Sequence, residues 1–273
     1  MKYQLIYILI FVFSLSVSEW LFSKTNQIHI LFTESTNGVL QNCECPVQPY
    51  GGMARRKTLI DSLRSVHENV YLLDAGNFLS TFDRPVNDKK MLKLMHDLAY
   101  TAINFGQNET MYYASHNTIK PLCFVSLKGS HQVSSLEHKQ RMLIEKLHCR
   151  VIILGIYTTL QYESLKQELS KISATDLLFI LSQLSEDENK VLIDQFENKI
   201  DFILGNHSLD VLIGKWEKIK NTYVIKAGVD GQSVGHIQID SSGLIDISFH
   251  KVKQSILPDP EFLKQINHLE ASH

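Results

Sequence analysis

The sequence has little net charge and no run of like charge. Its 27 Lys and Arg residues nearly balance its 29 Asp and Glu residues, so the formal net charge is −2. A protein that binds a nucleic-acid backbone usually concentrates basic residues on one face. The balance therefore gives no electrostatic support for a nucleic-acid partner, and the scattered basic residues are interpreted as solvated surface groups.

The sequence also lacks an apolar run long enough for a membrane span. The most apolar stretch covers residues 5–13 and continues with small-residue breaks to Val17, whereas a span needs about 18 apolar residues. Lys2 precedes it, Ser16-Val17-Ser18 offers a small-x-small cleavage site, and no lipid-acceptor cysteine follows. We expect residues 1–18 to be a secretory signal peptide, or an uncleaved anchor, and the folded part to be extracytoplasmic, either periplasmic or secreted.

Internal repeats, long linkers and low-complexity segments are absent as well. With 273 residues and 44% hydrophobic content, the chain can bury one sizeable core. We expect one domain over residues 27–252 and a C-terminal tail or helix over residues 253–273, opened by Pro258 and Pro260. Buried strands are expected at residues 27–32, 70–73, 102–105, 122–127, 141–147, 151–157, 177–181, 202–205, 223–226, 235–240 and 244–252.

Helical periodicity lies between several of these strands. Helices are predicted over residues 54–66, 89–100 and 160–172, and a polar N-terminus suits another helix that begins near Ser185. In the first helix, Arg55 and Arg56 are expected to point outward. Strands alternating with helices, followed by a strand-rich end, predict an α/β sandwich with helices on the outer faces.

Short polar motifs follow five of the expected strands. They are Ser35-Thr36-Asn37-Gly38, Asp74-Ala75-Gly76-Asn77, Gly106-Gln107-Asn108-Glu109, Leu181-Ser182-Gln183-Leu184 and Gly205-Asn206-His207-Ser208-Leu209. Over residues 27–251 this pattern resembles the calcineurin-like metallophosphoesterases, and within them the 5′-nucleotidase branch. Its short extracytoplasmic members also carry a Cys-x-Cys followed by Gly-Gly-x-Ala-Arg-Arg. The resemblance implies a four-layer α-β-β-α sandwich of the metallophosphoesterase type, without a separate substrate-binding domain.

The resemblance also implies a two-metal phosphoesterase site, but this chain has replaced most of the ligands. The family's carboxylates and histidines give way to neutral groups at nearly every motif. Two dications about 4 Å apart repel by on the order of 15 kcal/mol at an effective dielectric of about 20, and amide oxygens bind transition metals weakly. We therefore expect no metal, no cofactor and no hydrolysis. The resulting pocket positions are Ser35, Asn37, Asn77, Gln107, Asn108, Gln183 and His207.

Three functions remain open at this point. The amides could line a wet cleft that binds an unknown small ligand or protein partner, or they could satisfy one another in a relic core. Alternatively, the chain is a divergent phosphoesterase with an unconventional single divalent metal at His207 and residual activity. A third possibility is a purely structural or interaction module. A membrane contact is expected only if the N-terminal segment stays as an anchor.

The cysteines supply the remaining candidate chemistry. Cys43 and Cys45 flank Glu44 in a loop, and a bridge between them would close a small strained ring of the oxidising, labile kind. A thiol–disulfide role for this pair competes with a structural role or with pairing to distant cysteines. Cys123 and Cys149 lie on or beside apolar strands and are expected to be buried free thiols. Four further histidines show no metal spacing and are interpreted as surface groups: His67, His96, His116 and His131.

Overall fold

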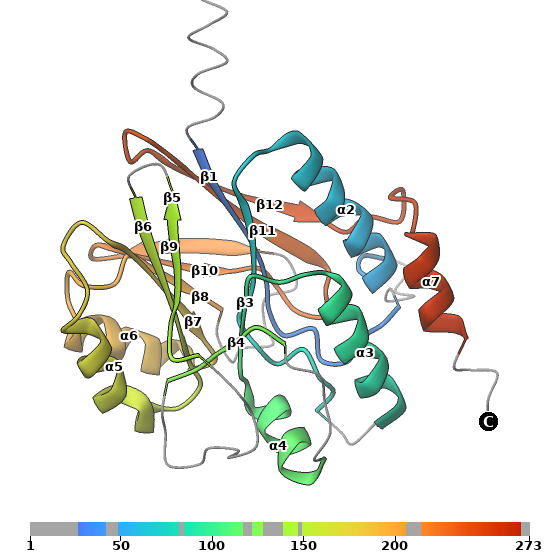
Figure 1. Ribbon diagram of the computed structural model, residues 1–273, viewed down its shortest axis with the longest axis horizontal. Helices are drawn as coiled ribbons and strands as arrows, with labels where there is room; N and C mark the ends of the chain where they lie inside the picture. Colours follow the sequence, from blue (N-terminus) through green and yellow to red (C-terminus); the bar gives the residue numbers. More distant parts are fainter. Residues whose placement is uncertain are drawn as a thin grey trace, which may run out of the picture.

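The computed structural model of the protein describes residues 27–41, 49–81, 85–116, 122–127, 139–146, 149–205 and 214–268. Within this part of the chain, two six-stranded sheets are packed together, and helices cover the outer face of each (Figure 1). The predicted α/β sandwich with helices on both outer faces is confirmed. Among the described residues, no helix combines the length and apolar character that crossing a membrane requires.

The first sheet is mixed and has β1 near its centre. Its strands, in spatial order, are β12 (Ile245–Lys251), β11 (Ser233–Asp240), β1 (Gln27–Thr33), β2 (Val70–Asp74), β3 (Ala102–Asn104) and β4 (Phe124–Val125). The run from β1 to β4 is parallel, while β11 and β12 form an antiparallel edge beside β1.

The second sheet is also mixed, with parallel strands at its centre. Its spatial order is β5 (Met142–Lys146), β6 (Cys149–Ile156), β7 (Leu177–Ser182), β8 (Phe202–Leu204), β10 (Thr222–Lys226) and β9 (Lys215–Ile219). The central strands from β6 to β10 are parallel, and both edge strands are antiparallel to their neighbours.

The alternation of side chains along β1 explains the layers. Ile30 and Phe32 face the second sheet and pack with Phe179 and Phe202 in the central core, whereas Leu31 points to the helices on the other side. This is the period of two expected for a strand buried on both faces. The helices that pack on the first sheet are α2 (Met53–Val66), α3 (Pro85–Asp97), α4 (Gln107–Ser115) and α7 (Pro260–Asn267).

The outer face of the second sheet is covered by the helices that connect its parallel strands. Two α-helices and one short 3₁₀ helix contribute: η1 (Thr159–Gln161), α5 (Tyr162–Leu169) and α6 (Glu186–Gln195). As predicted, α6 begins with polar residues after Ser185. The Ser185 side chain caps the helix by accepting a hydrogen bond from the N–H of Glu188. The two sheets and their helices therefore form the four predicted layers.

Two elements, α4 and β9, were missing from the sequence prediction, and two helices had wrong bounds. The helix expected over residues 160–172 is η1 followed by α5, which ends at Leu169. Helix α4 buries the polar residues Asn108 and Glu109 together with Tyr112 and Tyr113, so its buried face gives no clear apolar periodicity. Strand β9 is an exposed, lysine-containing edge strand, a pattern typical of protected sheet edges. Helix α3 begins at Pro85 and ends at Asp97, because Ala99 adopts a left-handed φ of 53°.

The prediction that Arg56 points outward is wrong. Its side chain is 1% exposed and is among the largest fully buried side chains of the described residues. The guanidinium donates to Thr36 Oγ1 at 2.9 Å and to the Met53 sulfur. Burial raises the pKa of nearby Asp74 and Tyr100, and the Arg56 cation acts against this rise at both groups. Tertiary partners from the β1 and β2 loops, invisible in the helical period, keep this charge inside.

Candidate functional site

The loops that follow β1 and β2 meet at the carboxyl ends of the parallel strands. Ser35 N–H donates to Gly76 O, and Asn37 N–H donates to Asn77 O, both at 2.9 Å. Asp230 N–H, from the loop between β10 and β11, donates to Ser35 O at 2.9 Å. The structure thus brings predicted pocket residues from separate motifs to one end of the sandwich, as parallel strands require.

Two of the predicted residues hydrogen-bond directly to each other across the two sheets. Asn77 Nδ2 donates to Gln183 Oε1 at 2.5 Å. Gln183 Nε2 in turn donates to Ala75 O at 3.0 Å and to Gly76 O at 3.2 Å. The two side chains are only 3% and 5% exposed. This orientation gives each buried NH₂ group an acceptor, so the two side chains satisfy each other and the neighbouring backbone.

The other predicted residues have different surroundings. Asn108 Nδ2 donates to Leu79 O at 2.8 Å, and Asn108 N–H contacts Asn77 Oδ1 at 3.3 Å. Asn37 Nδ2 donates to Asp230 Oδ1 at 3.0 Å. The Gln107 side chain is exposed, so it does not join this network. His207, like Leu209, lies outside the described residues.

Three of these positions have backbone conformations that ordinary residues avoid. The φ angles of Ser35, Asn37 and Asn77 are 44°, 55° and 56°. Left-handed conformations cost non-glycine residues about 1 kcal/mol or more and gather at functional sites. The loop-to-loop hydrogen bonds described above hold them in place. The backbone frame of the site is therefore kept although its side chains are neutral.

The buried carboxylate of Glu109 connects the loop after β2 to the loop after β3. It accepts backbone N–H bonds from Asn77 and Gly106 on Oε2 and from Leu79 on Oε1, each at 2.8 Å. Complete burial is the main cause that raises its pKa to about 7, while the three N–H donors act in the opposite direction. Glu109 stands in one of the quoted motifs, but its role as a loop anchor was not predicted.

Two more polar residues at this end were missed by sequence reasoning. Asn104 ends β3, and its Nδ2 lies 2.9–3.2 Å from the carbonyl oxygens of Ala75, Ile156 and Leu181, so it links the two sheets. Glu34 directly follows β1, is 4% exposed and accepts a hydrogen bond from Gly228 N–H at 3.0 Å. Their signal in the sequence was a polar residue at the carboxyl end of an apolar run.

The described residues at this end do not by themselves supply the ligands of a two-metal centre. Across the described ranges, only one group of three or more His, Cys, Asp or Glu side chains has ligand atoms close enough to share an ion, and it is elsewhere. Here the amide oxygen of Gln183 and that of Asn77 already accept hydrogen bonds. Both side chains are uncharged, and amide oxygens bind transition metals weakly.

The group that could hold a metal ion consists of His29, His67 and His236. These residues lie on β1, directly after α2, and on β11. The prediction that His67 is a surface group is wrong, because its ring is half-buried and stacks on His29 with centroids 4.2 Å apart. Residues 29, 67 and 236 are far apart in the sequence, so no local spacing could reveal the group.

The cysteine predictions have mixed outcomes. Cys123 is exposed and free, so its expected burial is wrong. It lies just before the two-residue strand β4, which is too short to bury it. Cys43, Cys45 and the side chain of Cys149 lie outside the described residues. The flanks of the Cys43–Cys45 loop are described: Gly38 N–H donates to Phe78 O and Met53 N–H to Leu40 O, both at 2.9 Å. The described residue Gly38 before this loop thus contacts the segment that follows β2, and Met53 after the loop contacts Leu40.

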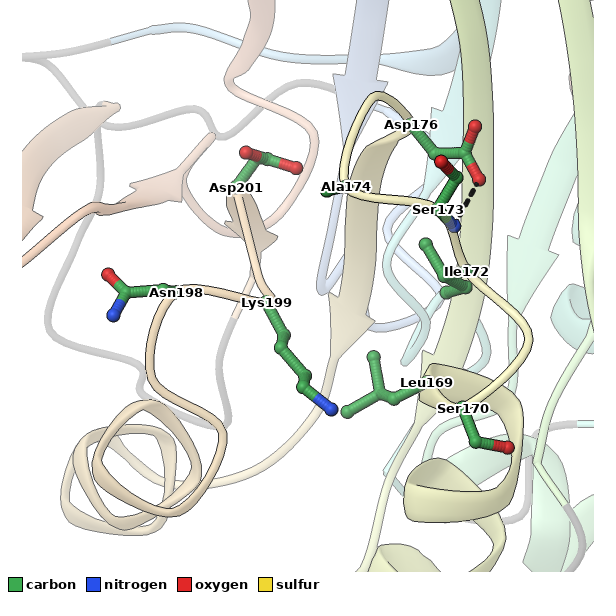
Figure 2. A pocket seen from close by; sticks show the side chains of 9 residues that line it. All are labelled: Leu169, Ser170, Ile172, Ser173, Ala174, Asp176, Asn198, Lys199 and Asp201. Carbon is green, nitrogen blue, oxygen red and sulfur yellow. Dashed lines mark hydrogen bonds between the residues drawn. The ribbon is translucent and has the colours of Figure 1, made fainter.

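The pocket in Figure 2 lies at the opposite end of the second sheet, where β7 and β8 begin. Its two carboxylates already have partners. Asp176 forms an ion pair with Arg150 at 2.6 Å and accepts the N–H of Ser173 at 2.8 Å. Asp201 accepts the N–H of Leu178 at 2.7 Å. None of the predicted site residues lines this pocket.

Comparison with known sequences identifies distant relatives. No family model matches the chain. A snake venom 5′-nucleotidase from Gloydius brevicauda is 34% identical over 93 residues, which cover 31% of this chain and 14% of that relative. The corresponding protein from Crotalus adamanteus is 34% identical over 89 residues, with the same coverage of each chain. The matched segment is thus distantly homologous to these nucleotidases, and it represents a small part of their length.

Comparison with solved structures defines the fold. A 5′-nucleotidase precursor from Thermus thermophilus matches with a TM-score of 0.67 and 17% identity, covering 88% of this chain and 57% of that one. The calcineurin-like phosphoesterase YfkN from Bacillus subtilis matches with a TM-score of 0.64 and 15% identity, covering 90% and 97%. The sulfate thiohydrolase SoxB from Thermus thermophilus matches with a TM-score of 0.73 and 11% identity, covering 90% of this chain and 60% of that one. The chain therefore has the metallophosphoesterase sandwich fold.

Proposed function

We propose that this chain is an exported protein with a phosphoesterase fold that does not hydrolyse phosphate esters. The observation that carries the proposal is the buried hydrogen bond between Asn77 and Gln183. The family would place a bridging carboxylate and an imidazole at these positions. Of the two interpretations left open by the sequence, mutual satisfaction of the amides is favoured over an open ligand cleft, because Asn77, Asn108 and Gln183 are all buried.

We assign the remaining chemistry to Cys43 and Cys45, acting on a dithiol partner outside the cytoplasm. In the exchange, a partner thiolate attacks one sulfur of the Cys43–Cys45 disulfide, a mixed disulfide forms and the other cysteine leaves as a thiolate. The second thiolate of the partner then attacks the partner sulfur of the mixed disulfide, which leaves an oxidised partner and a reduced Cys43–Cys45 pair.

The first prediction is that the protein lacks phosphoesterase activity. Purified without chelator and supplied with Mn²⁺ or Zn²⁺, it should give no turnover of AMP or bis(p-nitrophenyl) phosphate above the buffer rate. The reason is that the amides described at this end offer no pair of free ligands to clamp a phosphate between two ions. Steady-state assays with and without a chelator measure this.

Chelator-sensitive hydrolysis would contradict the proposal. Two variants then identify its source. Activity that disappears in His207→Ala but persists in His67→Ala would support the alternative function, a single-metal phosphoesterase at His207. Activity that disappears in His67→Ala instead would place the chemistry at the histidine group.

The second prediction concerns the redox state of the cysteine pair. In glutathione buffers, Cys43 and Cys45 should form a disulfide with a reduction potential above about −230 mV, because a strained exposed bridge is easily reduced. The measurement uses thiol alkylation and mass spectrometry in a Cys123→Ser background, since Cys123 is an exposed free thiol that would compete. Two free thiols at Cys43 and Cys45 in the most oxidising buffer would contradict the redox assignment.

A further inference from the structure

Four histidines lie together on the helix-facing side of the first sheet, near the amino end of β1. Leu31 faces the helices, and His29 shares its face because side chains alternate along a strand. His236 is directly opposite Leu31 in the antiparallel pair with β11. His67 follows α2 and packs on both rings, and His250 on β12 contacts His236. In Figure 1, this is the end at which β1 begins.

The geometry of three of these rings suits a shared metal ion. One ring nitrogen from each of His29, His67 and His236 lies within 4.8 Å of the others. The closest pair, His29 Nδ1 and His236 Nε2, is 3.0 Å apart. Two nitrogens bound to one tetrahedral zinc at about 2.0–2.1 Å are separated by about 3.3 Å. Small ring rotations would bring the three nitrogens to such a spacing.

The fourth histidine, His250, lies where it can hydrogen-bond to the ring nitrogen of His236 that would not bind the metal. His236 Nδ1 lies 3.2 Å from His250 Nε2, which leaves His236 Nε2 directed toward His29. When His236 Nδ1–H donates to His250, the Nε2 lone pair is free for a metal. Metal-bound histidines generally donate their other N–H to such a partner, which fixes the tautomer and the ring orientation.

Three of these four histidines, His29, His236 and His250, are in the uncharged state that metal binding needs. Burial is the main cause that lowers the pKa of His29 to about 4 and that of His236 to about 3, and it also lowers the pKa of His250. Near neutral pH these rings are therefore uncharged and have lone pairs. His29 and His236 are 2% and 1% exposed, while half-buried His67 offers an entry path from solvent.

This group is separate from the family metal position. His29 and Thr33 are four residues apart on β1, about 13 Å at roughly 3.3 Å per residue, and the family site lies beyond Thr33. The group also has no carboxylate among its three members. Imidazole nitrogens alone favour Zn²⁺, Cu²⁺ or Ni²⁺ over the hard cations Mg²⁺ and Ca²⁺.

We propose that His29 Nδ1, His236 Nε2 and one nitrogen of His67 bind a Zn²⁺-class ion, with His250 orienting His236. Three protein ligands leave one position for water. The ion ties the end of α2 to β1 and β11, so its role is to fasten this helix to the sheet. The site is independent of the proposed loss of hydrolysis and of the cysteine pair.

The test is titration of chelator-treated full-length protein with Zn²⁺ alone, followed by calorimetry and by the optical spectrum of bound Co²⁺. We expect one equivalent to bind. At a free Zn²⁺ concentration of about 100 times Kd, Tm should rise by about 5–10 °C. Replacing a ligand in His67→Ala should weaken binding by more than about tenfold, and His250→Phe, which removes the outer partner, by about 10- to 100-fold.

The control variants make the result specific. His96→Ala changes an exposed histidine paired with Asp97 and should bind Zn²⁺ as the wild type does. Cys43→Ser/Cys45→Ser and His207→Ala should also retain binding, and the Co²⁺ spectrum should lack a thiolate band. His67 is half-buried, so His67→Ala should keep its fold, which circular dichroism checks.

Absence of Zn²⁺ binding, or equal binding by His67→Ala and the wild type, would overturn the site. Because none of these readouts involves phosphate hydrolysis, this test and that of the proposed function fail separately.

Discussion

Glu109→Ala is expected to lower the free energy of unfolding by about 3 kcal/mol or more. The substitution removes the acceptor of three buried backbone N–H groups, those of Asn77, Leu79 and Gly106. Each buried donor left without a partner costs about 1–3 kcal/mol. The same loops position the amide pair, so the loss should also loosen the site. Urea unfolding monitored by fluorescence measures the change in midpoint and slope.

A matched control is available on the same helix turn. Gln107 is exposed, and Gln107→Ala should change stability by less than about 0.5 kcal/mol. If Glu109→Ala were as stable as this control, the three N–H groups would have to find other partners, and the role of Glu109 as the loop anchor would be rejected.

The pH dependence of Glu109→Gln provides a second measurement. The folded pKa of Glu109, about 7, is above its ordinary value of 4.5, so the folded state binds its proton more tightly than the unfolded state does. An acid whose pKa is raised in the folded state contributes stability that is fully present below about pH 4.5. This contribution is lost as pH rises through 7, and the loss is on the order of 3 kcal/mol. The stability of the wild type relative to Glu109→Gln should therefore fall across this window.

The comparison with the variant is needed because other groups titrate in the same range. Asp74 has a pKa raised to about 6 by burial and changes stability in the same direction as Glu109. His29 and His236, with lowered pKa values, act oppositely: their contribution is present above pH 6.5 and is lost toward acid. The difference between wild type and variant cancels these shared terms. A flat difference from pH 4.5 to 8 would contradict the raised pKa of Glu109.

Arg56→Ala is expected to cost about 3 kcal/mol or more of unfolding free energy. It empties the space of a fully buried side chain and leaves Thr36 Oγ1 without its guanidinium donor. It also removes the cation that lowers the pKa of buried Asp74. Unpairing buried charge and creating a cavity are both among the most destabilising kinds of substitution. Thermal and urea unfolding measure the loss.

The matched control is Lys57→Ala on the next position of α2. Lys57 forms a partly exposed ion pair with Asp61, which is worth about 0–1 kcal/mol. The destabilisation by Arg56→Ala should be larger above pH 6 than below pH 4, since the Asp74 carboxylate is then ionised without its cation. Equal effects of Arg56→Ala and Lys57→Ala would show that Arg56 is not part of the loop frame.

The local elements of the fold could be predicted because each depends on a short apolar pattern. The continuous apolar runs of β1, β6 and β7 are typical of strands buried on both faces. Helix α2 showed its apolar residues at helical spacing. The pattern failed where local signals were weak or absent, at α4 and at edge strand β9, and it placed Arg56 on the wrong side. A helical period cannot show that a cation will meet partners from another loop.

In the candidate site too, the residue positions could be predicted, but the contacts between them could not. The resemblance of the motifs predicted Asn77 and Gln183 as pocket positions, and the parallel strands that carry them bring both to one end of the sandwich. Which donor bonds to which acceptor could not be predicted, since Asn77 and Gln183 come from different sheets. The roles of Asn104 and Glu109 likewise appear only when the carbonyl and N–H groups of several loops are in place.

By itself, the sequence determined the order of most strands and helices and the uncharged side chains at the motif positions, because both are properties of single short segments. Only the tertiary structure decided that the replacing amides bind one another, that Arg56 is inside, and that His29, His67 and His236 meet. These outcomes depend on contacts between residues tens to hundreds of positions apart. Such contacts are fixed by how the two sheets and their helices pack, and no pattern within one segment contains that information.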